Sequence, residues 1–213
     1  MFNIEVSKNH NYYVGGGKGV LVHNKGNGNG YNGGSDGGCF LKGTYVLTPG
    51  GIPKPIESLS PHQEVVTYNE STRSIESCEI SRTMVHEVDE PVYTVSFGDS
   101  SVSSTGIHPF YVKLGSGFEW IAASELKVGD EILLSDGRQV EISSIDRHWM
   151  KTKVYNLEVD GNHNYFVGGG ETGGFALVHN KQVVYCVGHE YHNYFYNWKK
   201  DFHIHCGVPA WKD

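Results

Sequence analysis

The chain has 213 residues, which is enough for one domain of ordinary size with extensions or for two small domains. Charged residues make up 19% of it and the formal net charge is −7 without any basic block, so we expect no nucleic-acid partner. No apolar run approaches the roughly 18 residues of a membrane-spanning helix, and we expect no membrane partner.

The chain opens with one copy of a segment that occurs twice. Phe2–Gly17 reads FNIEVSKNHNYYVGGG, Tyr155–Gly170 reads YNLEVDGNHNYFVGGG, and both copies continue to the letters LVHNK. The copies lie too far apart for a solenoid, whose period is roughly 20–50 residues, so they mark the ends of two modules of one kind. We interpret residues 1–24 as the remnant of a preceding module. We expect its His23 and Asn24 to be inert, because no partner cysteine stands before them.

A glycine-rich segment separates this first copy from the rest of the chain. Residues 25–38 read KGNGNGYNGGSDGG and contain no aliphatic side chain, which is typical of a flexible linker. The chain has 28 glycines, about twice the ordinary usage, and they gather in such stretches. This composition disfavours a helix-rich fold.

Beyond residue 38 the sequence changes to short runs of β-branched and aromatic residues separated by turn signals. Such runs predict strands at Tyr45–Thr48, Val65–Tyr68, Val92–Phe97, Pro109–Lys113, Glu131–Leu134, Val140–Ile145 and Val154–Val159. The turn signals are PGG at 49–51, DEP at 89–91, LGSG at 114–117 and SDG at 135–137. The only helical hint is about one turn at Ala122–Leu126, so residues 39–180 are predicted to form an all-β domain with long strands.

The last part of the chain, residues 181–213, is rich in histidine and aromatic residues and poor in aliphatic ones. So short a segment does not fold alone without a metal or a disulfide. Its candidate zinc ligands are Cys186, His189, His192, His203, His205 and Cys206. Their spacing matches no established zinc pattern, so we expect no metal site and interpret the segment as a passenger. A metal-dependent effector function of this tail is an alternative.

Four motifs follow one another within residues 39–180. They are Cys39 in CFLKGT, Thr105 and His108 in TGIH, His163 in the repeated segment, and His179 with Asn180 at the end. Their order, together with WIAASELKVGD at 120–130, resembles the Hint superfamily of inteins, bacterial intein-like domains, Hedgehog autoprocessing domains and polymorphic-toxin modules. The resemblance implies a Hint-type horseshoe of long strands with two related halves, flanked by flexible arms. It also implies a domain that processes its own backbone.

The first motif places a nucleophile at the head of the domain. A cysteine thiolate is the best ordinary nucleophile near neutral pH, and Cys39 directly follows the carbonyl of Gly38. Attack on that carbonyl would replace the amide between the two residues by a thioester. In the families resembled, the equivalents of Thr105 and His108 activate this bond. We expect His108 to donate to the amide nitrogen and Thr105 to the carbonyl oxygen.

The last motif indicates a different reaction. The side-chain amide of an asparagine can attack its own backbone carbonyl, close a succinimide and break the bond that follows. Asn180 would cut the Asn180–Lys181 bond in this way, with His179 polarising the carbonyl or protonating the leaving amine. The resemblance gives His163 a helper role in the same step.

Two positions depart from the intein pattern. Splicing needs Cys, Ser or Thr after the terminal asparagine, whereas this chain has Lys181, whose amine is mostly protonated. Asn156 stands where inteins usually carry an aspartate, which affects the coordination of the two steps. We therefore predict single-turnover cleavage at one or both ends, with little or no joining of the flanking segments.

The resemblance also implies what the domain acts on and what it requires. Its substrate is its own flanking segments, no cofactor is required, and we expect a monomer. Toxin-associated relatives imply the release of a C-terminal effector from a longer secreted protein, although the sequence itself assigns no compartment. The alternative interpretation is a Hint-shaped scaffold that has lost its activity, with Lys181 and Asn156 as marks of decay.

Overall fold

The computed structural model describes residues 38–171 and 173–180, and elsewhere only the backbone of four short strands. These are β1 (Asn11–Val14), β2 (Val20–His23), β15 (Val183–Tyr185) and β16 (Asn193–Phe195). The chain divides into two compact units, one of Gly33–Val183 and one of Met1–Asn32 with Val184–Asp213. The predicted linker up to residue 37, Asn24, Lys181 and the candidate zinc ligands lie outside the described residues, and what was inferred about them stays a prediction.

The larger unit is built almost wholly of antiparallel strands, which confirms the predicted all-β class. Its sheet has the order β5-β4-β13-β14-β9-β11-β12-β3-β8-β7-β6, and β10 pairs with β9. The strands are β3 (Phe40–Leu41), β4 (Tyr45–Thr48), β5 (Ile52–Pro55), β6 (Glu64–Asn69), β7 (Ser74–Phe97), β8 (Ser100–Thr105), β9 (Pro109–Leu114), β10 (Gly117–Ala122), β11 (Glu131–Leu133), β12 (Gln139–Val159), β13 (Asn164–Gly168) and β14 (Ala176–His179). Two single 3-10 turns, η1 (Pro49–Gly51) and η2 (Ile56–Ser58), flank β5. The described residues include no helix with the length and apolarity of a membrane span.

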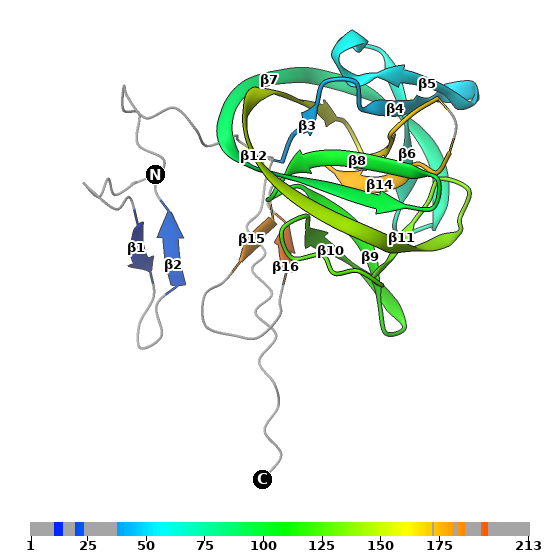
Figure 1. Cartoon of the computed structure of the whole chain (residues 1–213). Coiled ribbons are helices and arrows are strands. Elements are labelled where there is room, and N and C mark those ends of the chain that lie inside the picture. Colours follow the sequence, from blue (N-terminus) through cyan, green and yellow to red (C-terminus); the bar gives the residue numbers. More distant parts are fainter. Residues whose placement is uncertain are drawn as a thin grey trace. The chain divides into compact units, whose positions relative to one another are not determined.

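Strands β7 and β12 are much longer than the sequence pattern indicated, and they pair as one curved ribbon (Figure 1). The strands predicted at 140–145 and 154–159 are two parts of the single strand β12. The turn predicted at 89–91 is wrong, because these residues continue β7 and Pro91 lies opposite Trp149. At Pro91, β12 is the only described strand that pairs with β7, since the pairing of β7 with β8 begins at Val92. Proline has no N–H to donate, and it is tolerated where one side of a strand is unpaired.

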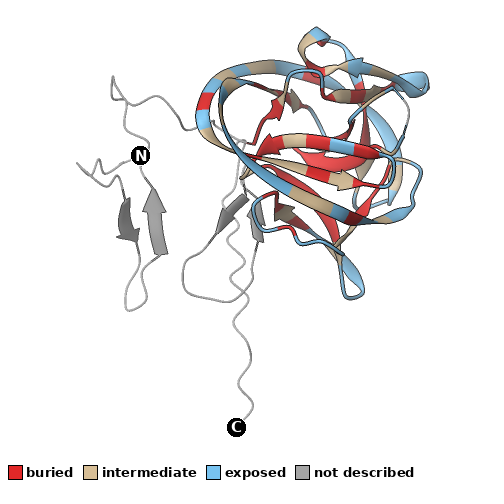
Figure 2. Cartoon of the chain, viewed as in Figure 1, coloured by how far each residue is buried: buried red, intermediate tan, exposed pale blue. Residues whose placement is uncertain are grey.

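The apolar core of this unit draws side chains from both halves of the sequence (Figure 2). Its largest fully buried members are Phe40, Ile56, Ile80, Phe97, Phe110, Ile132, Ile142, Leu157 and Tyr165. Burying each of these side chains stabilises the fold by at most about 1.5–3 kcal/mol. This is an upper value, because it is calculated against a fully extended unfolded chain and real unfolded chains already bury some apolar surface. These side chains hold β3, β12 and β13 together, and the predicted site residues lie at the ends of β3, β8, β9, β13 and β14.

The repeated segment forms the same hairpin twice. In the first copy β1 pairs with β2 and Asn11 lies opposite His23. In the second copy β13 pairs with β14 and Asn164 lies opposite His179. The register is therefore identical in the two hairpins. The second hairpin is embedded in the large sheet between β4 and β9, whereas the first belongs to the other unit.

Candidate functional site

The six site residues predicted from the sequence all lie in the larger unit, at the ends of strands. Cys39 directly precedes β3, Thr105 ends β8, His108 directly precedes β9, His163 directly precedes β13, His179 ends β14, and Asn180 follows it. All of them are buried except His163, which is half-buried. Strand ends supply such residues because the backbone there leaves the ladder and can turn a side chain toward a neighbouring segment.

Cys39 is held by a pair of hydrogen bonds to Thr105. The Cys39 backbone N–H donates to Thr105 Oγ1 at 2.9 Å, and the Thr105 N–H donates to the Cys39 carbonyl oxygen at 2.8 Å. The next residue, Phe40, pairs with Ser104 and continues the contact between β3 and β8. The Thr105 hydroxyl thus contacts the nitrogen of the Gly38–Cys39 bond. This differs from the expected contact with the carbonyl oxygen, because the pairing of β3 with β8 sets the direction of the hydroxyl.

Gly38 and His108 approach each other so closely that only glycine fits. A Cβ atom built on Gly38 would overlap the Cα, Cβ and Nδ1 atoms of His108. The backbone of His108 is held on both sides, since its N–H donates to the Thr105 carbonyl at 3.1 Å and its carbonyl accepts from the Ala123 N–H at 2.9 Å. The imidazole is therefore fixed against the peptide group that precedes Cys39.

The environment of His108 keeps its imidazole neutral. Complete burial lowers the pKa of His108 to about 3, and the nearby Gly38 backbone acts in the opposite direction. The ring packs against Phe40, with centroids 4.0 Å apart, and edge-on to Phe110 at 6.3 Å. Neither ring nitrogen meets hydrogen-bond geometry with any of the described residues. At neutral pH the imidazole beside the Gly38–Cys39 bond is thus uncharged, and its protonated form would be a strong proton donor.

Tyr165 is a buried polar residue of this region that the sequence analysis missed. It lies on β13 within the core, and its ring is edge-on to Phe40 with centroids 6.3 Å apart. Burial raises the pKa of Tyr165 well above its ordinary value, and a negative charge on the nearby Cys39 thiol adds to the shift. The sequence carried one signal for this residue: the first copy of the repeated segment also has a tyrosine, Tyr12, at the position that corresponds to Tyr165.

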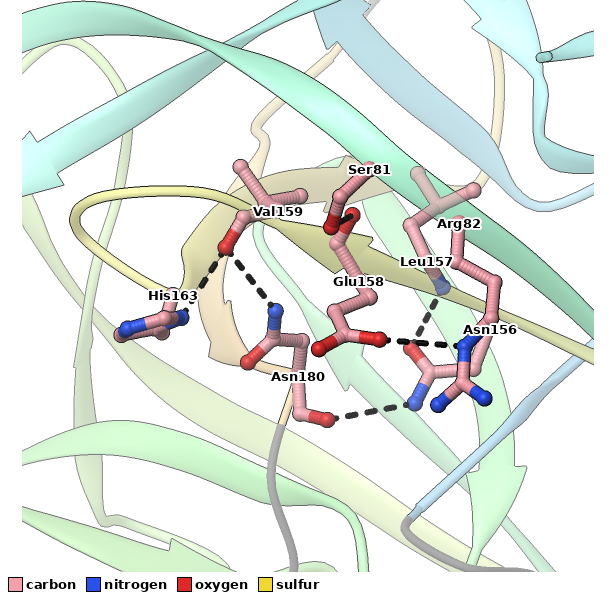
Figure 3. Close-up of polar contacts among 8 residues, drawn as sticks. All are labelled: Ser81, Arg82, Asn156, Leu157, Glu158, Val159, His163 and Asn180. Atoms are coloured by element: carbon pink, nitrogen blue, oxygen red, sulfur yellow. Dashed lines mark hydrogen bonds and ion pairs between the residues drawn. The ribbon is translucent and has the colours of Figure 1, made fainter. Parts of the chain in front are cut away.

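Asn180 and His163 share one hydrogen-bond acceptor, the backbone carbonyl of Val159 (Figure 3). Asn180 Nδ2 donates to this oxygen at 3.3 Å, and His163 Nδ1 lies 3.0 Å from it. The Asn180 N–H also donates to the carbonyl of His163 at 3.0 Å. His163 has a φ of 56°, an uncommon left-handed value for a residue other than glycine, which turns the chain between β12 and β13. The structure therefore brings the predicted helper histidine to the terminal asparagine.

Asn156 contacts the carbonyl group of the Asn180–Lys181 bond (Figure 3). Its Nδ2 lies 3.5 Å from the Asn180 carbonyl oxygen, and its Oδ1 accepts hydrogen bonds from the Tyr165 hydroxyl at 2.7 Å and the Leu157 N–H at 2.8 Å. Since Tyr165 also lies near Cys39, this network connects the surroundings of both predicted cleavage points.

His179 is positioned by aromatic packing. Its ring is edge-on to Trp120 on β10, with centroids 4.9 Å apart and an interplanar angle of 81°. Trp120 Nε1 donates to Glu70 Oε1 at 3.3 Å. Glu70 as a residue is exposed, yet its carboxyl is partly shielded, and this desolvation raises its pKa. Trp120 and Glu70 are supporting residues that the sequence analysis did not single out.

The described residues contain no group of three or more His, Cys, Asp or Glu side chains arranged to hold a metal ion. The chemistry that the described geometry supports is acyl transfer. It combines a buried thiol, a neutral imidazole beside the preceding peptide bond, and an asparagine amide next to its own carbonyl.

Comparison with known proteins agrees with this geometry. The chain matches the family model described as the pretoxin HINT domain over residues 45–181, a range that begins after Cys39 and includes Asn180. It resembles the solution structure of a bacterial intein-like domain from Clostridium thermocellum, at 33% sequence identity and a TM-score of 0.59, over 67% of this chain and 98% of that one. A comparison with curated proteins gives no match.

Two intein structures share the fold at lower identity. The TvoVMA intein is 20% identical with a TM-score of 0.59, over 68% of this chain and 99% of that one. A DnaB intein from Synechocystis sp. PCC 6803 is 23% identical with a TM-score of 0.56, over the same 68% and 99%. At these identities the likeness shows the fold alone.

Proposed function

The chain belongs to the pretoxin HINT domain family, whose fold is that of self-processing domains, and we propose that it cuts its own backbone at Gly38–Cys39 and Asn180–Lys181. The observation that carries this proposal is the arrangement at the first bond. The Cys39 amide nitrogen is bonded to the Thr105 hydroxyl, while Gly38 lies directly against the neutral His108 imidazole.

At the N-terminal junction the Cys39 thiol is the nucleophile. The Cys39 thiol gives up its proton to water as its sulfur bonds to the Gly38 carbonyl carbon, and the carbon–nitrogen bond to Cys39 breaks. The departing nitrogen keeps its contact with the Thr105 hydroxyl and gains a proton through His108, because the lowered pKa makes the protonated imidazole a strong donor. The product is a thioester between Gly38 and Cys39, which water or an added thiol then breaks.

At the C-terminal junction the Asn180 side chain is the nucleophile. Its Nδ2 bonds to its own backbone carbonyl carbon, and the bond to Lys181 breaks, leaving a succinimide at residue 180. The Val159 carbonyl supports this step because it accepts a hydrogen bond from Nδ2 and so raises the electron density on that nitrogen. His179 polarises the carbonyl or protonates the leaving amine, and His163, which contacts the same Val159 carbonyl as Asn180, has a helper role.

The outcome is cleavage rather than splicing. Joining the flanks needs a Cys, Ser or Thr side chain at residue 181 to receive the acyl group, and Lys181 carries a protonated amine at neutral pH. The domain's substrate is its own flanking segments, and it releases residues 181–213 as a C-terminal effector or part of one. Each molecule reacts once and without a cofactor.

Intact-mass measurement on the freshly translated full chain tests this function. We expect wild type to yield fragments that end at residue 38, at residue 180, or at both. Cys39→Ala suppresses the first break and Asn180→Ala the second, while hydroxylamine accelerates the first because it intercepts a thioester. A wild-type chain that stays whole with hydroxylamine and thiols across neutral pH contradicts the proposal.

A further inference from the structure

We infer that Asn156 is a catalytic residue of the second cleavage, whose side-chain amide polarises the Asn180 carbonyl. This inference rests on the proposed function, because it concerns the bond that Asn180 is proposed to break. The pattern of inteins has an aspartate at this position, so the asparagine was, with Lys181, one of the two features that suggested lost activity. The contacts of Asn156 indicate instead that its amide is a hydrogen-bond donor placed for the cyclisation of Asn180.

The orientation of the Asn156 amide is determined by its neighbours. A backbone N–H can only donate, so the Leu157 N–H at 2.8 Å requires an oxygen at the Asn156 atom that it meets. The Tyr165 hydroxyl donates to the same Oδ1 at 2.7 Å. With its oxygen held in this way, the amide must direct Nδ2 to its other side, where the Asn180 carbonyl oxygen lies 3.5 Å away (Figure 3).

Cyclisation develops negative charge on the oxygen that Asn156 faces. Asn180 Nδ2 bonds to the backbone carbonyl carbon and loses one proton; the bond to Lys181 then breaks and the leaving nitrogen gains one proton. Between these events the carbon is tetrahedral and its oxygen is anionic. The 3.5 Å contact is long in the uncut chain, and such contacts shorten as the charge on the acceptor grows. A donor aimed at such an oxygen contributes about 100- to 1,000-fold in rate.

An aspartate at residue 156 would reverse this interaction. One carboxylate oxygen would keep the bonds to Tyr165 and Leu157, and the other would face the Asn180 carbonyl oxygen as a second acceptor. Two acceptors repel each other, and the repulsion grows as the carbonyl oxygen becomes anionic. The asparagine donor already faces the Asn180 carbonyl oxygen in the uncut chain, before either bond breaks.

Tyr165 acts as a positioning residue for the Asn156 amide. The variant Tyr165→Phe keeps the aromatic packing and removes the hydroxyl that holds Oδ1. If the hydroxyl acts through Asn156, the variant slows the C-terminal break in the wild-type background and has no effect on it in Asn156→Ala. A purely structural role of the hydroxyl would give the same reduction in both backgrounds.

The experiment follows both breaks by intact mass after a pulse of cell-free translation of the full chain. We expect Asn156→Asp and Asn156→Ala to slow the break after Asn180 by about 100-fold or more, while the hydroxylamine-dependent break before Cys39 persists. Ser116→Asp is the matched control, because it adds the same charge at an exposed residue in the turn between β9 and β10. It is expected to cut at the wild-type rate at both junctions.

The outcomes separate the inference from the function on which it rests. If Asn180→Ala abolishes the second break while both Asn156 variants cut at the wild-type rate, the role of Asn156 is overturned and the proposed function stands. If the Asn156 variants slow both breaks equally, the role of Asn156 is also overturned, because that role concerns only the break after Asn180. A wild-type chain that never breaks after Asn180 removes the proposed second cleavage, on which the inference rests.

Discussion

Single residues at the N-terminal junction are constrained by close backbone approach more than by side-chain contacts. Gly38 lies against His108, whose own backbone bonds to Thr105 and Ala123. Glycine at this position has no side chain to block the approach of the Cys39 thiol to the Gly38 carbonyl. The structure adds a steric reason, since any larger residue at position 38 must displace the imidazole.

Replacing Gly38 by alanine tests this constraint. The added Cβ overlaps His108, so we expect Gly38→Ala to slow hydroxylamine-dependent cleavage before Cys39 by about 100-fold, the cost of moving a reacting group by an ångström. Cleavage after Asn180 continues. The control is Gly117→Ala, because a Cβ at that glycine meets no atom within 4 Å. Normal cleavage before Cys39 in Gly38→Ala shows that the close approach does not matter.

The buried imidazole of His108 also predicts how stability depends on pH. Its pKa of about 3 in the folded chain lies below the ordinary 6.5, so the unfolded chain takes up this proton first as the pH falls. The stabilising contribution is complete above about pH 6.5 and is lost progressively toward pH 3. The limiting slope for one proton is about 1.4 kcal/mol per pH unit.

Urea unfolding between pH 7 and pH 4 measures this effect. The chain carries Cys39→Ala and Asn180→Ala to prevent cleavage, and it is compared with the same chain carrying His108→Gln. We expect the free energy of unfolding to fall more steeply with acid when His108 is present. Parallel curves for the two chains contradict a depressed pKa of His108.

Among the elements, the ribbon of β7 and β12 has two functionally different parts. Near its ends it lies within the large sheet, and Ile142 is fully buried there. Midway along, Val85 is 54% exposed and Trp149 is 69% exposed, with the Trp149 indole donating to Asp89 at 2.7 Å. The core thus depends on both ends of β12, and the Asn156 site on its C-terminal part, rather than on the exposed middle of the ribbon.

Alanine substitutions in the two parts should therefore differ in cost. Ile142→Ala is expected to lower the free energy of unfolding by about 2–5 kcal/mol, because it leaves a cavity in the core. Val85→Ala is expected to change it by no more than about 0.5 kcal/mol. Chemical denaturation of the two variants in the non-cleaving chain checks the difference, and similar losses would show that the middle of the ribbon carries stability as well.

At the scale of the whole molecule, the same hairpin register occurs in two different settings. The hairpin of β13 and β14 lies between β4 and β9 and has buried side chains throughout. The described pairing of β1 and β2 is with each other only. A two-stranded hairpin alone is marginally stable in water, so the surroundings rather than the motif determine whether a terminal asparagine is held for cyclisation.

We therefore expect the Asn24–Lys25 bond to stay intact although its sequence matches that of the proposed second cleavage point. Intact mass of the full chain should show no fragment that begins at residue 25, and Asn24→Ala should leave the fragment pattern unchanged. A fragment beginning at Lys25 that disappears in Asn24→Ala would show that the first hairpin enters a reactive site.

The sequence by itself determined the all-β class, the family and the order of the predicted site residues. These follow from local features: β-branched runs between turns predict strands such as β4 and β9, and the proposed nucleophilic chemistry requires a thiol and an asparagine directly beside the bonds proposed to break. Adjacency along the chain is fixed covalently, so no folding is needed to recognise Cys39 after Gly38 or Asn180 before Lys181.

The tertiary structure alone decided how those residues meet. The continuous ribbon through Pro91, the direction of the Thr105 hydroxyl and the contact of Asn156 with Asn180 all depend on pairing between distant segments. Register between such strands is set by the burial of whole faces, which no local pattern encodes. The same reason explains why Tyr165 was missed, since its role arises only when β13 lies beside β3 and β12 in the core.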